Sequence, residues 1–161
     1  MGGRTRGRIG AGLLSGAIGT QALNIVTYLD MVLRGRPESP VPVEGARRFG
    51  QMAGIDALVD SGDAAESRRK AVGALLGYAT GISVGAAYGA VYPMLASMPL
   101  RTRGLVVAAA AMAAGDVPSI LSGLTDPKDW TVQDWLADIV PHLTYGAATV
   151  LAFEAWRRGA D

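Results

Sequence analysis

The chain has 161 residues, enough for one domain, and half of them are hydrophobic. Its formal net charge of +1 gives no basic or acidic excess that would point to nucleic acid, and the lack of cysteine excludes disulfides and thiolate chemistry. Four apolar runs between the charged stretches are each long enough to cross a hydrocarbon core of about 30 Å as a helix. The composition therefore predicts an all-α protein, a four-helix transmembrane bundle forming a single membrane domain over residues 1–161, with one short amphipathic interfacial helix.

The first expected span covers residues 9–33 and follows the basic residues Arg4, Arg6 and Arg8. A basic start before an apolar run also occurs in secretory signals, but this run is longer, so an uncleaved span is expected. At 3.6 residues per turn, one side of this helix carries a stripe of small and polar residues. The stripe consists of Gly12, Gly16, Thr20, Asn24, Thr27 and Asp30. Arg34, four residues after Asp30, is expected to pair with it at the membrane boundary.

Residues 34–70 form the one sizeable segment outside the spans. Pro37, Pro40 and Pro42 predict an extended or turning path. Apolar residues then recur at near-helical spacing with charges between them, which predicts an amphipathic helix over about 43–60 at the membrane surface. Asp63 and Glu66 have the spacing of a capping pair at the start of the next helix.

The second expected span, residues 71–95, contains five glycines at strict four-residue spacing: Gly73, Gly77, Gly81, Gly85 and Gly89. In water each interior glycine costs about 1 kcal/mol relative to alanine, whereas in lipid such a row forms a groove for another helix backbone, as in a glycine zipper. Five positions four apart wrap about 160° around the helix, which is too far for one straight partner. The row therefore predicts two partners, one within the bundle and a second from another copy, with tight packing inside one bundle as the alternative.

The third and fourth expected spans cover residues 104–124 and 135–156. Asp116 and Pro118 interrupt the third, and Thr131 and Asp134 have capping spacing before the fourth. Trp135 and the tryptophan at position 156 lie about 30 Å apart on a helix, the spacing of aromatic belts at the two interfaces. Four spans place both termini on one side. The Lys/Arg counts of the two sides are nearly equal, so the orientation stays open, although the acidic stretch before the fourth span favours the termini inside.

Ionisable side chains within these spans form a candidate polar track. An Asp at the centre of a span costs about 3 kcal/mol on translocon scales, so such residues usually face the bundle interior or water. The track consists of Asn24, Asp30, Asp116, Asp138, His142 and Tyr145. One interpretation is a proton- or ion-linked path in which the histidine titrates near neutrality. The other is a structural network in which a carboxylate holds the histidine and fixes the helix register.

The sequence contains little that predicts catalysis. The run Gly81–Gly85 matches G-x-S-x-G, and Asp116 and His142 follow in hydrolase order, but a nucleophile elbow needs a strand before the serine and here a helix is expected. A single histidine and scattered carboxylates give no metal or cofactor site. The leading expectation is a non-enzymatic subunit or scaffold of a membrane assembly, or a homo-oligomer, with lipid as the surrounding partner. The alternatives are a small proton- or ion-linked transporter or channel, and a lipid-modifying membrane enzyme with the histidine as base.

Several strings in the chain resemble those of small, uncharacterised integral membrane proteins of high-GC actinobacteria. They occur at residues 19–30 (GTQALNIVTYLD), 34–39 (RGRPES), 115–118 (GDVP) and 134–142 (DWLADIVPH). The similarity runs through most of the chain, and it implies a multi-pass protein of a bacterial cytoplasmic membrane. It implies no activity.

Overall fold

The computed structural model describes residues 2–159, with side chains from Thr5 onward. Four long helices dominate: α1 (Gly2–Arg34), α4 (Asp63–Leu95), α5 (Leu100–Leu121) and α6 (Val132–Gly159). Two shorter helices, α2 (Val41–Ala53) and α3 (Asp56–Val59), join α1 to α4, and a 3-10 turn over Pro127–Asp129 precedes α6. No strand occurs in residues 2–159. The predicted all-α four-helix bundle is confirmed.

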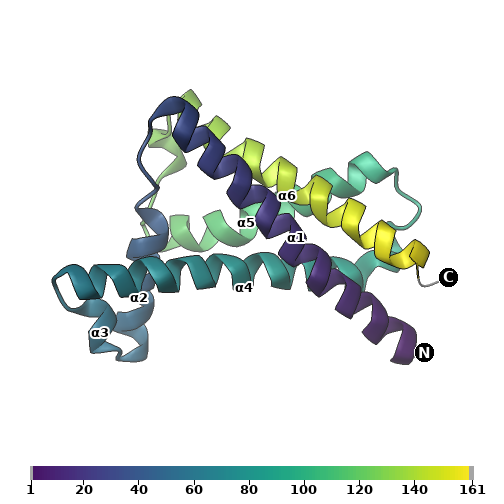
Figure 1. Ribbon diagram of the computed structural model, residues 1–161, viewed down its shortest axis with the longest axis horizontal. Helices are drawn as coiled ribbons and strands as arrows, with labels where there is room; N and C mark the ends of the chain where they lie inside the picture. The colour runs from purple at the N-terminus through teal and green to yellow at the C-terminus, as the bar shows by residue number, and fades with distance from the viewer. Residues whose placement is uncertain (1, 160–161) are drawn as a thin grey trace.

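The helix α1 lies between α4 and α6 and contacts both, while α5 packs mainly on α6 (Figure 1). Both described chain ends lie at one end of the bundle, together with the α4–α5 connection. The α1–α4 connection with α2 and α3, and the α5–α6 connection, lie at the opposite end. We call these the terminal end and the connection end. This arrangement is that of four helices that cross a layer alternately in opposite directions.

All four long helices are long and apolar enough to cross a membrane, α1 over Thr5–Arg34 and the others over their full lengths. Their outward faces carry large apolar side chains that are more than half exposed, including Ile25, Leu75, Leu105 and Leu151. Contact of these apolar faces with lipid tails is favourable, whereas their exposure to water would be unfavourable. The chain therefore has the make-up of a multi-pass membrane protein. All four helices begin before the expected spans because charged or polar residues there continue the helix, whereas α5 ends early at Leu121, just before Gly123 at φ 69°.

The backbones of α1 and α4 approach closely where small residues of the two helices meet. A Cβ atom added to Gly16 would lie 2.7 Å from the carbonyl oxygen of Gly81, and one added to Gly85 would meet the backbone of Gly12 and Gly16. Gly89 meets the Arg8 carbonyl in the same way. These glycines are therefore required by space, because any side chain would push the helices apart.

The remaining two glycines of the row have different surroundings. A Cβ atom on Gly73 would lie 2.7 Å from the carbonyl oxygen of Pro42, so the partner there is the start of α2. One on Gly77 would meet nothing within 4 Å. The described neighbours of the row thus lie on α1, α2 and α6, where Tyr145 contacts Gly81, and the contact with a second copy stays a prediction.

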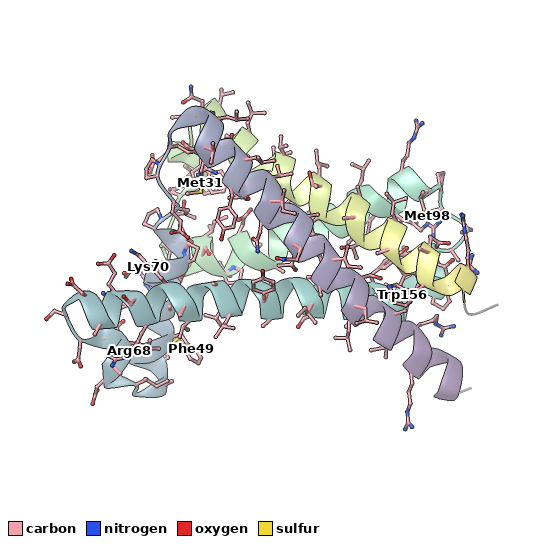
Figure 2. The ribbon with its side chains drawn as sticks, in the orientation of Figure 1. Met31, Phe49, Arg68, Lys70, Met98 and Trp156 are labelled. Carbon is pink, nitrogen blue, oxygen red and sulfur yellow. The ribbon has the colours of Figure 1, made fainter. Side chains whose placement is uncertain are left out.

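The expected single amphipathic helix over 43–60 is wrong in one respect, because it is two helices with a corner between them. Gly54 adopts φ 68°, a left-handed conformation that ends α2, and the Ile55 N–H donates to the Gly50 carbonyl at 2.8 Å. Leu58 of α3 then folds back and is buried. The apolar residues Phe49 and Met52 of α2 stay exposed, and α2 runs across α4 (Figures 1 and 2).

One of the two expected helix caps forms. Before α6, the Thr131 N–H and hydroxyl donate to the Asp134 carboxylate at 2.8 and 2.6 Å, and the Asp134 N–H donates to the Thr131 hydroxyl at 3.2 Å. The expected cap from Asp63 and Glu66 is wrong. The N-cap of α4 is Gly62, without a side-chain hydrogen bond, and the Glu66 carboxylate lies 2.7 Å from the Lys70 ammonium instead. An i,i+4 lysine offers that carboxylate a charged partner on the helix surface.

Candidate functional site: a carboxyl–histidine group between α5 and α6

Close packing of α5 on α6 brings ionisable side chains of the two helices together. A Cβ atom added to Gly146 would lie 2.7 Å from the Ala108 nitrogen and 2.8 Å from its Cβ, so the two backbones nearly touch at mid-length. Because the helices are antiparallel, residues after Ala108 on α5 face residues before Gly146 on α6. Asp116 of α5 is thereby placed opposite Asp138 and His142 of α6.

The histidine is held by the residue one turn before it. His142 Nδ1 lies 2.8 Å from the Asp138 backbone carbonyl oxygen and 3.2 Å from its carboxylate Oδ1. A neutral ring would donate from Nδ1 to these oxygens, which fixes its tautomer and leaves Nε2 as the acceptor. The i,i+4 spacing foreseen from sequence is what brings the two groups together.

The second carboxylate oxygen of Asp138 gives the group its distinctive chemistry. Oδ2 is buried and accepts no hydrogen bond from any described N–H or O–H group. The Asp116 carboxyl of α5 lies close enough to Asp138 and His142 to interact electrostatically with both. Two carboxylates bond to one another only through a proton, so a proton shared between Asp116 and Asp138 would supply the missing donor.

The group lies inward along α6 from the connection end. Counted along α6 from Trp135, Asp138 lies about 4–5 Å deeper and His142 about 10 Å deeper, at 1.5 Å per residue. The side chains of His142 and Asp138 keep 17 and 20% of their surface exposed. The group is therefore within about two helical turns of Trp135 and remains partly accessible.

The other predicted members of the polar track lie elsewhere. The buried Tyr145 hydroxyl donates to the Gly81 carbonyl at 2.5 Å, which ties α6 to α4. Asn24 is half-buried on α1, and no described contact joins it to the group on α5 and α6. The continuous track expected from the sequence is thus divided.

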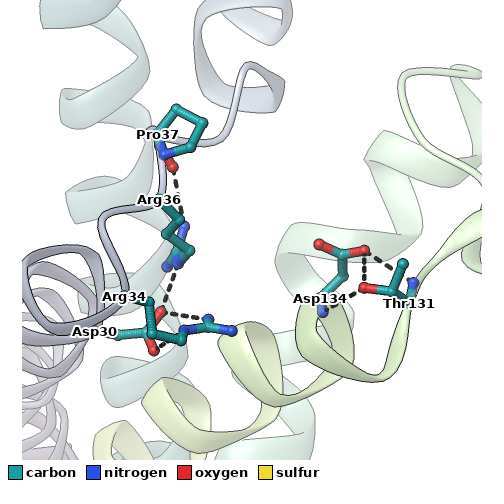
Figure 3. Close-up of polar contacts among 6 residues, drawn as sticks. All are labelled: Asp30, Arg34, Arg36, Pro37, Thr131 and Asp134. Carbon is teal, nitrogen blue, oxygen red and sulfur yellow. Dashed lines mark hydrogen bonds and ion pairs between the residues drawn. The ribbon is translucent and has the colours of Figure 1, made fainter.

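Asp30 belongs to a separate ion-pair cluster at the connection end. Its carboxylate binds Arg34 at 2.6 Å, as expected from the spacing, and also Arg36 at 2.5 Å (Figure 3). The Thr131–Asp134 cap of α6 lies near this cluster. Because the Asp30 carboxylate already binds two guanidinium groups, we assign it a structural role.

Sequence reasoning missed a second buried polar group, at the terminal end. Arg103 donates to Glu154 at 2.5 Å, and the two side chains are 9 and 8% exposed. Arg157 approaches the same carboxylate at 3.3 Å, and the Arg103 guanidinium also lies 5.6 Å from the centre of the Tyr92 ring. Tyr92 and Tyr88 pack with Phe153 beside this pair. In the sequence Arg103 resembles part of the basic α4–α5 turn, and only the register of α5 on α6 identifies its partner.

The serine of the G-x-S-x-G run lies in the middle of α4, not at a strand-to-helix turn, so the hydrolase interpretation stays rejected. Ser83 faces a shallow groove between α4 and α5 that is lined mostly by small or apolar residues. No group of three or more acidic or histidine side chains in the described residues has the geometry to hold a metal ion.

Comparison of the chain with protein-family models, curated proteins and solved structures finds no match.

Proposed function

We propose that the chain is a small, non-enzymatic, proton-linked transporter or channel whose proton site is Asp116, Asp138 and His142. The observation that carries this proposal is the buried oxygen of Asp138 that has no hydrogen-bond donor, on a carboxyl group that interacts with the second carboxyl group of Asp116. Ionisable residues within spans are costly and typically mark proton relays and ion pathways. A group of two carboxyls and one imidazole has several places for a single proton.

The surroundings of the site favour exchange from the connection end. The partly exposed Asp138 and His142 lie toward that interface. Toward the terminal end, α5 and α6 are closed by the close contact at Gly146 and by the Arg103–Glu154 pair. Movement of a proton from this site to the terminal end therefore requires α5 to move relative to α6. The resemblance to actinobacterial proteins supports a bacterial cytoplasmic membrane as the location.

Proton flux into liposomes tests the proposal. Purified protein is reconstituted with a pH-sensitive dye inside, and a pH gradient and a membrane potential are imposed. We expect flux above that of empty liposomes, and loss of that flux in Asp116→Asn and in His142→Ala. Asp129→Asn is the matched control, because Asp129 is an exposed carboxylate of the α5–α6 connection outside the site. Absence of flux in the wild type, or equal flux in all four proteins, would reject the proposal.

A second candidate function is that of a packing subunit in a larger membrane assembly or a homo-oligomer. It is favoured by the shallow groove between α4 and α5, which is lined mostly by small or apolar side chains, and by the open face at Gly77. Native mass spectrometry from lipid nanodiscs measures the copy number and any companion. Detection of the monomer alone would reject this candidate function. That result would not affect the interpretation of the flux experiment.

A further inference from the structure

The two ends of the bundle differ in charge in a way that counts of Lys and Arg do not reveal. Among the described residues, the terminal end carries a single carboxylate, Glu154, whereas all the others lie at or toward the connection end. The terminal end nevertheless has six described arginines: Arg6, Arg8, Arg101, Arg103, Arg157 and Arg158. It is therefore strongly cationic.

Ion pairing increases this difference. At the connection end Arg34 and Arg36 bind Asp30, and Lys70 binds Glu66 at 2.7 Å. Arg47 likewise binds Glu44, and its guanidinium lowers the pKa of that carboxyl, so the carboxylate stays charged at neutral pH and keeps the arginine compensated.

At the terminal end Glu154 is already occupied by Arg103 and Arg157. Arg6, Arg101 and Arg158 are exposed, and no carboxylate in residues 5–159 pairs with them. They come from three different segments, the start of α1, the start of α5 and the end of α6. Three guanidinium groups without a carboxylate partner in residues 5–159 therefore lie at the terminal end.

Trp156 places these arginines at headgroup depth. It lies at the terminal end near Met98 (Figure 2), and 51% of its surface is exposed. Tryptophan rings concentrate at the headgroup level of bilayers, and the planar guanidinium fork matches phosphate oxygens. We propose that the terminal end is a binding surface for the headgroups of anionic phospholipids, with Arg6, Arg101 and Arg158 as the phosphate-binding residues.

This assignment also orients the chain. The cytoplasmic leaflet is the anionic one and attracts basic segments next to a span. The terminal end then faces the cytoplasm, and the connection end with the Asp116 group faces the opposite side. The lipid surface is independent of proton transport, because none of its residues belongs to the carboxyl–histidine group.

Quenching of single tryptophans by brominated lipids tests the surface. Trp130→Phe/Trp135→Phe leaves Trp156 as the reporter of the terminal end, and Trp130→Phe/Trp156→Phe leaves Trp135 as the reporter of the connection end. Each is placed in symmetric vesicles of phosphatidylcholine and phosphatidylglycerol, with bromine on one lipid or the other. We expect Trp156 to be quenched more by the anionic lipid, and Trp135 equally by both.

Arginine variants then separate specific binding from a general preference. Arg101→Gln/Arg158→Gln should abolish the preference at Trp156, and high salt should weaken it because the charges are exposed. Arg68→Gln, an exposed arginine at the connection end, is the control and should leave the preference unchanged. The proposal would be overturned if Trp156 and Trp135 showed the same preference between the two brominated lipids. It would also be overturned if the preference of Trp156 for the anionic lipid persisted in the double variant. Unchanged elution on size-exclusion chromatography checks that each variant is folded.

Discussion

Glu154 and Asp116 illustrate two ways in which this chain tolerates charge inside a helix bundle. Glu154 is surrounded by cations and needs no proton to be stable, since Arg103 and Arg157 both reach it. Asp116 faces another carboxyl and a histidine, so its interactions depend on where a proton resides. The first arrangement is suited to holding helices together, and the second to a change of state.

Loss of the Glu154 charge should therefore destabilise the bundle strongly. In Glu154→Gln the buried Arg103 guanidinium keeps its charge without a carboxylate, and breaking a buried pair in this way typically costs about 3–5 kcal/mol. Unfolding in mixed micelles with increasing SDS measures the change. The double variant Arg103→Met/Glu154→Met should recover much of the loss, because it removes both charges.

The control for this experiment is Glu66→Gln, which breaks the exposed pair with Lys70. Exposed pairs contribute little to stability, so this variant should unfold close to the wild type. If Glu154→Gln were as stable as Glu66→Gln, the Arg103–Glu154 pair would not be the stabilising contact that its burial indicates.

At the scale of elements, the contact between α1 and α4 is made by backbone rather than by interlocking side chains. Gly12 and Gly16 on one helix meet Gly81, Gly85 and Gly89 on the other. Such a contact gains from dispersion between closely spaced backbones and tolerates no added methyl group.

Two glycine-to-alanine changes on the same helix should therefore have opposite effects. Gly85→Ala places a methyl group against the backbone of α1, and overpacking of this kind costs about 1–3 kcal/mol. Gly77→Ala adds a methyl group where nothing lies within 4 Å, so the higher helix propensity of alanine should leave stability unchanged or slightly raised. Thermal unfolding in detergent measures both. Equal melting temperatures would show that the helices do not cross at Gly85.

The sequence predicted the elements well because their signals are local. Apolar runs give the long helices, the spacing of Thr131 and Asp134 gives the cap, and the four-residue step gives Asp30–Arg34 and Asp138–His142. The corner at Gly54 was missed because apolar spacing continues through it, and a glycine is tolerated inside many helices.

The contacts between elements were harder to predict, because they depend on register. Which residues of α5 face α6 is decided by how closely Gly146 and Ala108 approach, and this determines both the Arg103–Glu154 pair and the meeting of Asp116 with Asp138. The partner of Gly73 is likewise Pro42, from a segment outside the expected spans. Periodicity within one helix carries no information of this kind.

At the scale of the whole molecule, the arrangement of the four long helices makes a prediction about sidedness. The chain has no cysteine, so single cysteines report position without interference. Ser61→Cys and Lys128→Cys, both exposed at the connection end, should react with an impermeant maleimide from the same side of sealed vesicles. Ser97→Cys, in the α4–α5 connection, should react only from the other side. Labelling of positions 61 and 128 from opposite faces would mean that either α4 or α5 does not cross, and the side from which position 97 reacts would tell which one.

The place of α1 between α4 and α6 has a consequence for biogenesis. Of the four long helices, α1 is made first, and it is flanked by α4, which follows after two short helices, and by α6, which is made last of the four. Until α6 is complete, the face of α1 around Gly19, which Tyr145 and Thr149 cover in the finished bundle, lacks these two neighbours. Assembly therefore closes in one late step, and a chain cut short before α6 leaves this face of α1 uncovered and prone to misassembly.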